Sequence, residues 1–204
     1  GRVTLGINIT PDGSQDGEAS YLMTKVQQWV SRFGANHLSH VDTWYAFNNT
    51  IMKTLEYPMI AISLSWKQWD KLISPLFAAI LPKAKISRHF PWNVLFAPLS
   101  RQGLGLIHPH DRQHLSQIQT IFRHSDRHSP TGQLIRASLE QLQLELGIPD
   151  PVLESSHELY GCLATPCWLS HIWQYSHSKG ITLTPSIPQH LLQTTNPWTR
   201  PVLP

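Results

Sequence analysis

Cysteine, charged residues and long apolar runs are all scarce in this chain of 204 residues. Two cysteines, Cys162 and Cys167, are too few for a disulfide framework, so we expect an intracellular, reducing location in the cytoplasm or the nucleus. No run of about 18 apolar residues occurs, and we therefore expect no membrane-spanning helix. Charged residues make up 14% of the chain and hydrophobic residues 41%, a balance typical of a folded protein.

Sequence patterns that accompany catalysis are also missing. The chain has no glycine-rich phosphate-binding loop and no Ser-His-Asp or Cys-His arrangement with the context of a nucleophile. Its thirteen acidic residues are scattered along the sequence. The sequence therefore predicts no catalytic residue in this chain.

Positive charge is concentrated in the middle of the chain. Residues 83–128 contain two acidic residues and seven basic ones, namely Lys83, Lys85, Arg88, Arg101, Arg112, Arg123 and Arg127. The rest of the chain has an excess of two negative charges, so the net charge of +3 arises in this region. A basic middle between nearly neutral ends is typical of phosphate-binding proteins, although many such patches are ordinary solvated surface.

Hydrophobic spacing predicts a mainly α-helical chain with a few short strands. Helices are expected over residues 18–33, from Ser39 to Pro58, from Ser65 to Ile80 with a break at Ser74-Pro75, and over residues 111–123, 130–146 and 166–178. The second of these would bury a face made of Val41, Trp44, Tyr45, Asn48, Ile51, Met52 and Leu55. Short strands are expected near residues 3–9, 92–97 and 104–107, the last two as a possible hairpin.

Four motifs follow one another in an order that resembles a known family. They are Leu5-Gly6-Ile7, Trp29, the stretch Asn49–Pro58 that ends in Tyr57-Pro58, and Val94–Pro98 followed by Gly103-Leu104-Gly105-Leu106. Residues 1–107 thereby resemble the region after the catalytic palm motifs of reverse transcriptases from non-LTR-type retrotransposons. The chain departs from the usual pattern before Gly103, where a double glycine is commoner.

The resemblance implies five segments: a terminal palm-like strand and turn (1–13), a helical thumb-like domain (14–82), a basic connecting segment (83–110), a helical extension (111–180) and a Pro-rich tail (181–204). The family's polymerase chemistry rests on an aromatic-x-Asp-Asp motif whose carboxylates hold two divalent metal ions, Mg²⁺. This chain contains no Asp-Asp pair. The resemblance therefore implies that the catalytic residues lie in an upstream palm domain of the same polypeptide, and that this chain itself needs no cofactor.

A template–primer duplex, an RNA–DNA hybrid, is the partner that the resemblance implies. Cations of the basic segment would contact its phosphates, with Phe90 and Trp92 available for stacking. The candidate contacts are Lys53, Lys83, Lys85, Arg88, His89 and Arg101. Each has an ordinary alternative, since Phe90 and Trp92 would equally fill a core and Lys53 would equally stabilise the end of its helix.

Two groups of residues have the composition of a metal site. His110 and His114 have the i, i+4 spacing of two ligands on one helix, but a helix that begins at Asp111 would leave His110 outside a formed turn. His157, Cys162, Cys167 and His171 have the chemistry of a zinc site at an unusual spacing. Buried thiols and surface imidazoles explain the second group more simply, so we predict no metal site.

The leading hypothesis is thus a non-catalytic fragment of a retroelement reverse transcriptase, an RNA-directed DNA polymerase, that grips a duplex through its backbone. One alternative is a degenerate, transposon-derived helical scaffold that binds no nucleic acid. A second alternative is a small zinc-binding protein that uses the His and Cys residues between positions 157 and 171.

Overall fold

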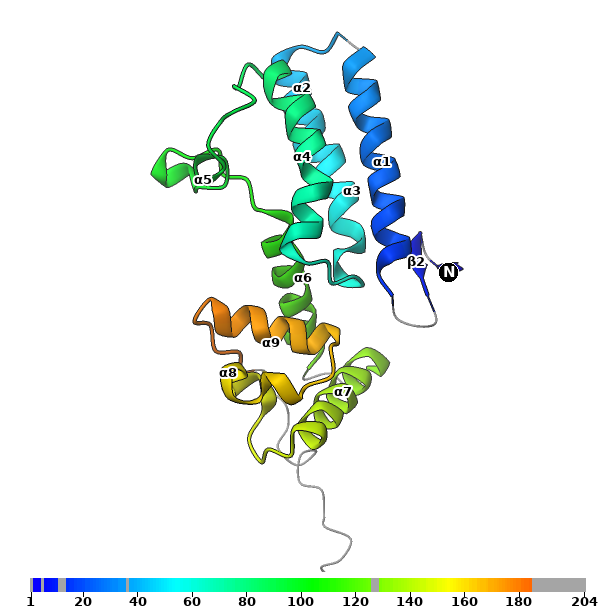
Figure 1. The fold of residues 1–204 in the computed structure, drawn as a ribbon, viewed down its shortest axis with the longest axis vertical. Coiled ribbons are helices and arrows are strands. Elements are labelled where there is room, and N and C mark those ends of the chain that lie inside the picture. The colour runs from blue at the N-terminus through cyan, green and yellow to red at the C-terminus, as the bar shows by residue number, and fades with distance from the viewer. Residues whose placement is uncertain (1, 5, 11–13, 36, 126–128, 185–204) are drawn as a thin grey trace, which may run out of the picture. The chain divides into compact units, whose positions relative to one another are not determined.

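In the computed structural model the chain is mainly α-helical, which confirms the predicted fold class (Figure 1). The structure describes residues 2–4, 6–10, 14–35, 37–125 and 129–184. The chain divides into two compact units, residues 1–116 and residues 117–204. Each unit has its own hydrophobic core, and the two cores share no residue.

The N-terminal strand expected over residues 3–9 is two strands. β1 (Arg2–Thr4) and β2 (Ile7–Ile9) pair in antiparallel register, with Val3 opposite Asn8. The chain reverses between them, where Gly6 has a φ of +81° that favours glycine. A single strand was the wrong prediction here, because alternating side chains look the same on either side of a tight reversal.

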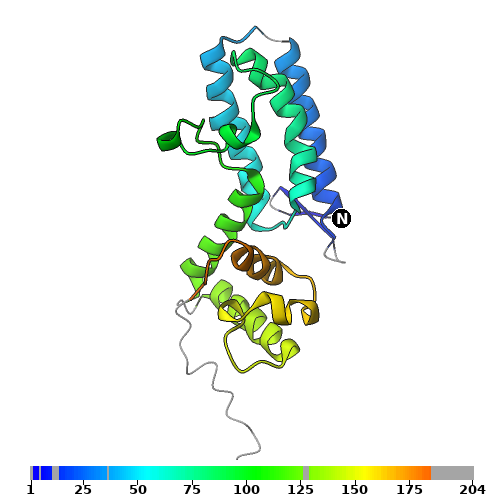
Figure 2. The same ribbon diagram turned by 60° about the vertical axis from the view of Figure 1, so that its left-hand side comes forward.

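Three helical segments form the body of the first unit. They are α1 (Asp16–Ala35), a continuous second segment made of α2 (His40–Ala46), η1 (Phe47–Ile51), α3 (Met52–Glu56) and η2 (Tyr57–Ile60), and α4 (Trp66–Lys83). Figures 1 and 2 both show α1 beside α4. Ser39 and Ser65 begin the second and third segments, and each hydroxyl accepts a hydrogen bond from the backbone N–H three residues on.

In the second helical segment every fourth residue is buried on one side. The π-helical turn η1 makes this spacing possible. The residues on this buried stripe are Thr43, Phe47, Ile51, Leu55 and Met59. An α-helix turns every 3.6 residues, so a stride of four drifts around it. The i→i+5 bonding of η1 widens one turn and keeps the stripe on one side. Val41 and Tyr45, which the α-helical period places inside, are instead exposed.

The predicted break at Pro75 is also wrong, since α4 continues through it and through Pro82. Proline removes one backbone donor from a helix and crowds the carbonyl four residues before it. The Ser74 hydroxyl donates to the carbonyl of Asp70 at 2.6 Å, one residue before the Lys71 carbonyl that has no proline N–H to accept from. Leu72, Ile73, Leu76 and Phe77 on either side of Pro75 are all buried, so core packing holds the helix together.

The segment after α4 is compact, but it contains no strand between residues 84 and 108, all of which are described. The expected strand at 92–97 is the short helix α5 (Trp92–Leu95), and η3 (Leu99–Arg101) follows it. The expected strand at 104–107 runs back beside α5: the Leu104 N–H donates to the Val94 carbonyl and the Gly105 N–H to the Ala97 carbonyl. A four-residue helix is too short to show its period in sequence.

Helix α6 (Pro109–His124) runs from the first unit into the second. The second unit continues with α7 (Pro130–Leu146), η4 (Val152–Glu154), α8 (His157–Tyr160), η5 (Gly161–Leu163) and α9 (Trp168–Ser178). α7 has the predicted signals, with Ser129 as N-cap, Pro130 first and Gly147 left-handed at its end. None of the helices in the described residues is both long and apolar enough to cross a membrane.

Helix α9 begins two residues later than its sequence suggests. The hydroxyl of the expected cap, Thr165, donates to Glu145 Oε1 instead, and its backbone N–H donates to the same oxygen at 2.6 Å. Cys167 takes its place: its Sγ accepts from the Ser170 N–H at 3.4 Å, and the Ser170 hydroxyl accepts from the Cys167 N–H. A long-range contact to α7 therefore decides where the helix starts.

Candidate nucleic-acid interface

A stretch of forty residues without an acidic residue lies in the first unit. No Asp or Glu occurs between Asp70 and Asp111, and five Lys or Arg residues do. The stretch contains most of α4, α5, η3 and the start of α6. We call residues 85–101 the basic loop, because four of the predicted phosphate contacts lie in it.

Lys83 lies just outside the basic loop and has a structural contact. Its Nζ donates to the backbone carbonyl of Phe33, in the last turn of α1. The last carbonyls of a helix have no partner within the helix and carry partial negative charge, so a lysine there stabilises the helix end. Lys83 thus joins α1 to α4.

Lys85 has the left-handed conformation that ends α4, with a φ of +61°. Its N–H donates to the carbonyl of Pro82, and the Ile86 N–H donates to the carbonyl of Leu81. These two bonds form a Schellman motif, in which glycine usually stands where Lys85 does. The backbone at Lys85 is therefore fixed while its side chain is exposed.

The other predicted phosphate contacts of the basic loop, Arg88, His89 and Arg101, are exposed as well. No ion pair involves Lys85, Arg88 or Arg101 among the residues that the structure describes. Lys53 differs, because its Nζ lies 2.9 Å from Glu56 Oε2, and Arg112 pairs with the other oxygen of the same carboxylate. The side chain of Lys53 is nevertheless 58% exposed.

Aromatic residues attach the basic loop to α4. The ring of Trp92 meets Phe77 edge-on at 5.6 Å between centroids, and Phe96 meets Phe77 at 6.0 Å. Phe90 is half-buried against the first core, whereas Trp92 keeps 39% of its surface exposed. Phe90 therefore fits the core interpretation, and Trp92 has a ring face that is partly open to solvent.

Gly103 closes the loop, and no other residue type fits there. A Cβ at this position would lie 2.1 Å from the carbonyl oxygen of Ala97. The chain crosses itself at this point, where Gly105 donates to that same carbonyl. The Pro-to-Gly spacing between Pro98 and Gly103 thus encodes a tight backbone crossing rather than a hairpin turn.

A buried polar cluster at the start of α6 was missed as a unit by sequence reasoning. His108 is buried, its ring stacks on Trp66 with 3.7 Å between centroids, and its Nε2 lies 3.0 Å from Asp70 Oδ1. Its Nδ1 accepts from the backbone N–H of His110 at 3.2 Å, so the proton is on Nε2 and points to Asp70. The only sequence signal was the density of histidines, because Trp66 and Asp70 lie about forty residues earlier.

Gln113 extends this polar cluster into the core. Its Oε1 accepts from the Leu64 N–H and from the indole N–H of Trp69, both at 2.9 Å, and its Nε2 donates to the Leu64 carbonyl. Gln113 is fully buried, so these bonds are shielded from water. One side chain on α6 therefore satisfies three buried groups at the start of α4.

The residues of the alternative zinc site do not converge. Cys162 is exposed, Cys167 caps α9, and the His157 ring lies between Gly161 and the edge of Trp173. Burial lowers the pKa of His157, and nearby His177 lowers it further; burial also lowers the pKa of His171. Within the described residues no group of three or more His, Cys, Asp or Glu side chains is placed to hold a metal ion.

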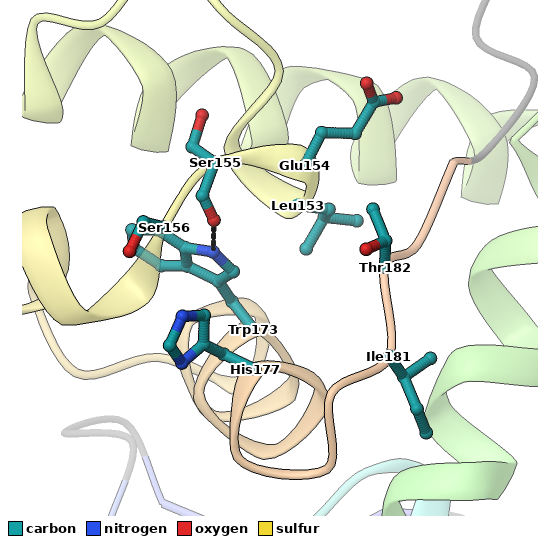
Figure 3. Close-up of a pocket in the computed structure, with 8 residues that line it drawn as sticks. All are labelled: Leu153, Glu154, Ser155, Ser156, Trp173, His177, Ile181 and Thr182. Carbon is teal, nitrogen blue, oxygen red and sulfur yellow. Dashed lines mark hydrogen bonds between the residues drawn. The ribbon is translucent and has the colours of Figure 1, made fainter.

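Two cavities are lined entirely by residues that the structure describes, one in each unit, and neither is lined by a predicted site residue. A cavity of about 240 Å³ in the second unit lies between η4 and the end of α9 (Figure 3). Trp173 forms one wall and donates its indole N–H to the Ser155 carbonyl at 2.8 Å, while the carboxylate of Glu154 points away from the indole. A groove of about 460 Å³ in the first unit is lined by α1, α4 and Leu64.

Comparisons with protein-family models, with curated proteins and with solved structures each found no match to this chain. The resemblance to reverse transcriptases accordingly stays a prediction from the four sequence motifs.

Proposed function

We propose that this chain is a non-catalytic part of a retroelement reverse transcriptase and that its basic loop grips the backbone of a template–primer duplex. Lys85, Arg88, His89 and Arg101 would contact phosphates, and an upstream palm domain would supply the polymerase chemistry with its two Mg²⁺ ions. The single observation that carries the proposal is the exposure of these cations in a stretch of forty residues without an acid.

Electrostatics supports a backbone contact more than base readout. Each phosphate that a cation neutralises releases counterions, and this gain does not depend on base sequence. RNA-containing duplexes are recognised mainly by shape and by backbone contacts. Carboxylates near the cations would weaken both effects, and the sequence has none between Asp70 and Asp111.

The fixed backbone of the basic loop supports the same proposal. The Schellman motif at Lys85 and the crossing at Gly103 hold both ends of the loop. Trp92 and Phe96 anchor its middle on Phe77. A held loop loses less conformational freedom on binding than a disordered one, so more of the phosphate attraction is realised as affinity.

Lys53 and Lys83 carry less of the proposal. Lys83 already donates to the carbonyl of Phe33, and Lys53 shares Glu56 with Arg112. Both remain predicted contacts, and replacing Lys83 would also disturb the end of α1. A test of the interface is cleaner when it leaves these two lysines in place.

The experiment is a titration of a fluorescent RNA–DNA hybrid with the purified full chain at several salt concentrations. The triple variant Lys85→Glu, Arg88→Glu, Arg101→Glu is compared with a control triple outside the basic region, Arg32→Glu, Lys67→Glu, Lys179→Glu. All six residues are exposed, and both triples change the net charge equally. We expect the first triple to lower the affinity strongly and to reduce the slope of log K against log salt by roughly two to three phosphate contacts.

Equal losses in both triples would show that net charge, not the basic loop, attracts the duplex. If the folded chain does not bind at low salt, the proposal fails and the chain is better described as a helical scaffold.

A further inference from the structure

The first two turns of α6 bring two imidazole nitrogens together. His110 Nε2 and His114 Nε2 are 3.2 Å apart, whereas the two ring centroids are 4.5 Å apart and the rings are inclined by 77°. The rings therefore converge at their Nε2 atoms. His110 is half-buried and His114 nearly fully buried, at 4% exposure.

The start of α6 makes this pair possible. The helix begins at Pro109, two residues before the start that the sequence indicated, and the Arg112 N–H donates to the carbonyl of His108. His110 is therefore inside the first turn, and His114 lies directly above it one turn later. The sequence-based reason for setting this pair aside, that His110 lies before the helix, is wrong.

The separation of the two nitrogens matches that of two ligands on one metal ion. Zn–N bonds of 2.0–2.1 Å at a tetrahedral angle place two nitrogens about 3.3 Å apart. Imidazole suits zinc, copper and nickel, whereas calcium and magnesium prefer oxygen. We infer that His110 and His114 form a two-imidazole site for a late first-row divalent transition metal, with the ion bound between the two Nε2 atoms.

The neighbours of the pair determine how many protein ligands the site offers. His108 is not a third ligand, because its Nε2 faces Asp70 and its Nδ1 accepts from the His110 N–H. Within the described residues no third His, Cys, Asp or Glu completes a group. Water or a group from a partner molecule therefore fills the remaining positions, so the ion stays exchangeable and clamps the first two turns of α6.

The test uses the purified full chain with Cys162→Ser and Cys167→Ser, which removes thiol binding elsewhere. Zn²⁺ is titrated by calorimetry, and the imidazole ¹⁵N resonances are followed by NMR. We expect binding of one equivalent of Zn²⁺ with shifts of the Nε2 resonances of His110 and His114. His110→Ala should weaken that binding by about tenfold or more, and His37→Ala, at an exposed histidine outside both proposed sites, should leave it unchanged.

His110→Gln serves as the second variant, because it keeps a polar side chain at this half-buried position, and circular dichroism confirms that each variant is folded. Equal zinc affinity of His110→Gln and the parent would overturn the inference. So would the absence of Nε2 shifts at saturating Zn²⁺, which would leave the two rings as a hydrogen-bonded pair only.

Discussion

Among the described residues each unit has one fully buried tryptophan, and the two units satisfy its indole N–H in different ways. Trp69 in the first unit is 0% exposed and donates to the side chain of Gln113, 44 residues away. Trp173 in the second unit is 1% exposed and donates to the backbone carbonyl of Ser155, 18 residues away. The two residues have the same burial but different kinds of partner.

This difference decides how each core responds to substitution. Gln113 can be replaced, and its loss leaves three buried groups without their partner. The Ser155 carbonyl belongs to the main chain, so no substitution of Ser155 removes it. The first core is thus vulnerable at a polar residue outside its apolar cluster, and the second core mainly at Trp173 itself.

The largest effect is expected when either tryptophan is removed. Trp69→Ala and Trp173→Ala should each lower the free energy of unfolding of their own unit by about 3–5 kcal/mol, from lost burial and the cavity left behind. Because the two cores share no residue, hydrogen exchange should accelerate in α1 and α4 for the first variant and in α7 and α9 for the second. Equal acceleration in both units for each variant would mean that the chain unfolds as one cooperative body.

The next effect tests the partners of the tryptophans. Gln113→Ala should destabilise the first unit by about 2–4 kcal/mol, because three buried donors and acceptors lose hydrogen bonds. Ser155→Ala should cost less than about 1 kcal/mol, since the carbonyl that Trp173 uses remains. Urea unfolding of both variants measures the contrast, and Gln119→Ala, at an exposed position of α6, is the control. Similar losses of unfolding free energy for Gln113→Ala and Ser155→Ala would show that the two tryptophans do not differ in how their partners can be removed.

Acid is expected to weaken the second unit by a smaller amount. The pKa values of His157 and His171 lie below the ordinary value in the folded chain, so the unfolded chain takes up protons first as the pH falls. The contribution of these two histidines to the free energy of unfolding is complete above the ordinary histidine pKa. It is lost as the pH falls through that value, and no more is lost below the lowered pKa values of the folded chain. Hydrogen exchange of α9 from about pH 8 to about pH 5, corrected for intrinsic exchange rates, should show falling protection. His157→Gln should make the protection of α9 depend less on pH. Protection that rises as the pH falls would contradict this prediction.

The smallest effect is expected at an exposed cation. Lys53→Ala should change stability by less than about 1 kcal/mol, because its ion pair with Glu56 is in water, and added salt should remove even that. Arg136 is the buried counterpart in the second unit, where its Nη1 donates to the Ser125 carbonyl at 3.2 Å. Arg136→Ala should therefore cost more, about 1–3 kcal/mol, in thermal unfolding. A larger loss at Lys53 than at Arg136 would reverse the expected order.

Local signals in the sequence were enough to predict most helices. Ser39 and Ser65 as caps, and Ser129, Pro130 and Gly147 around α7, depend on hydrogen bonds within one turn, so neighbouring residues specify them. The mainly α-helical class followed from the same periodicity. The exposed cations of the basic loop could also be named in advance, because charged side chains rarely enter a core.

What depended on distant residues could not be predicted in this way. The sequence by itself determined where helices form and where positive charge collects, since both are properties of short stretches. Tertiary structure alone decided that α4 passes through Pro75, that Glu145 takes Thr165 from the cap of α9, and that Gly103 crosses over Ala97. It also placed Lys83 on Phe33, and Trp66 and Asp70 on His108. The contacts of Thr165, Lys83 and His108 join residues 20 to 50 positions apart, whereas the crossing at Gly103 joins residues six positions apart. In each case packing outweighs the local preference that the sequence displays.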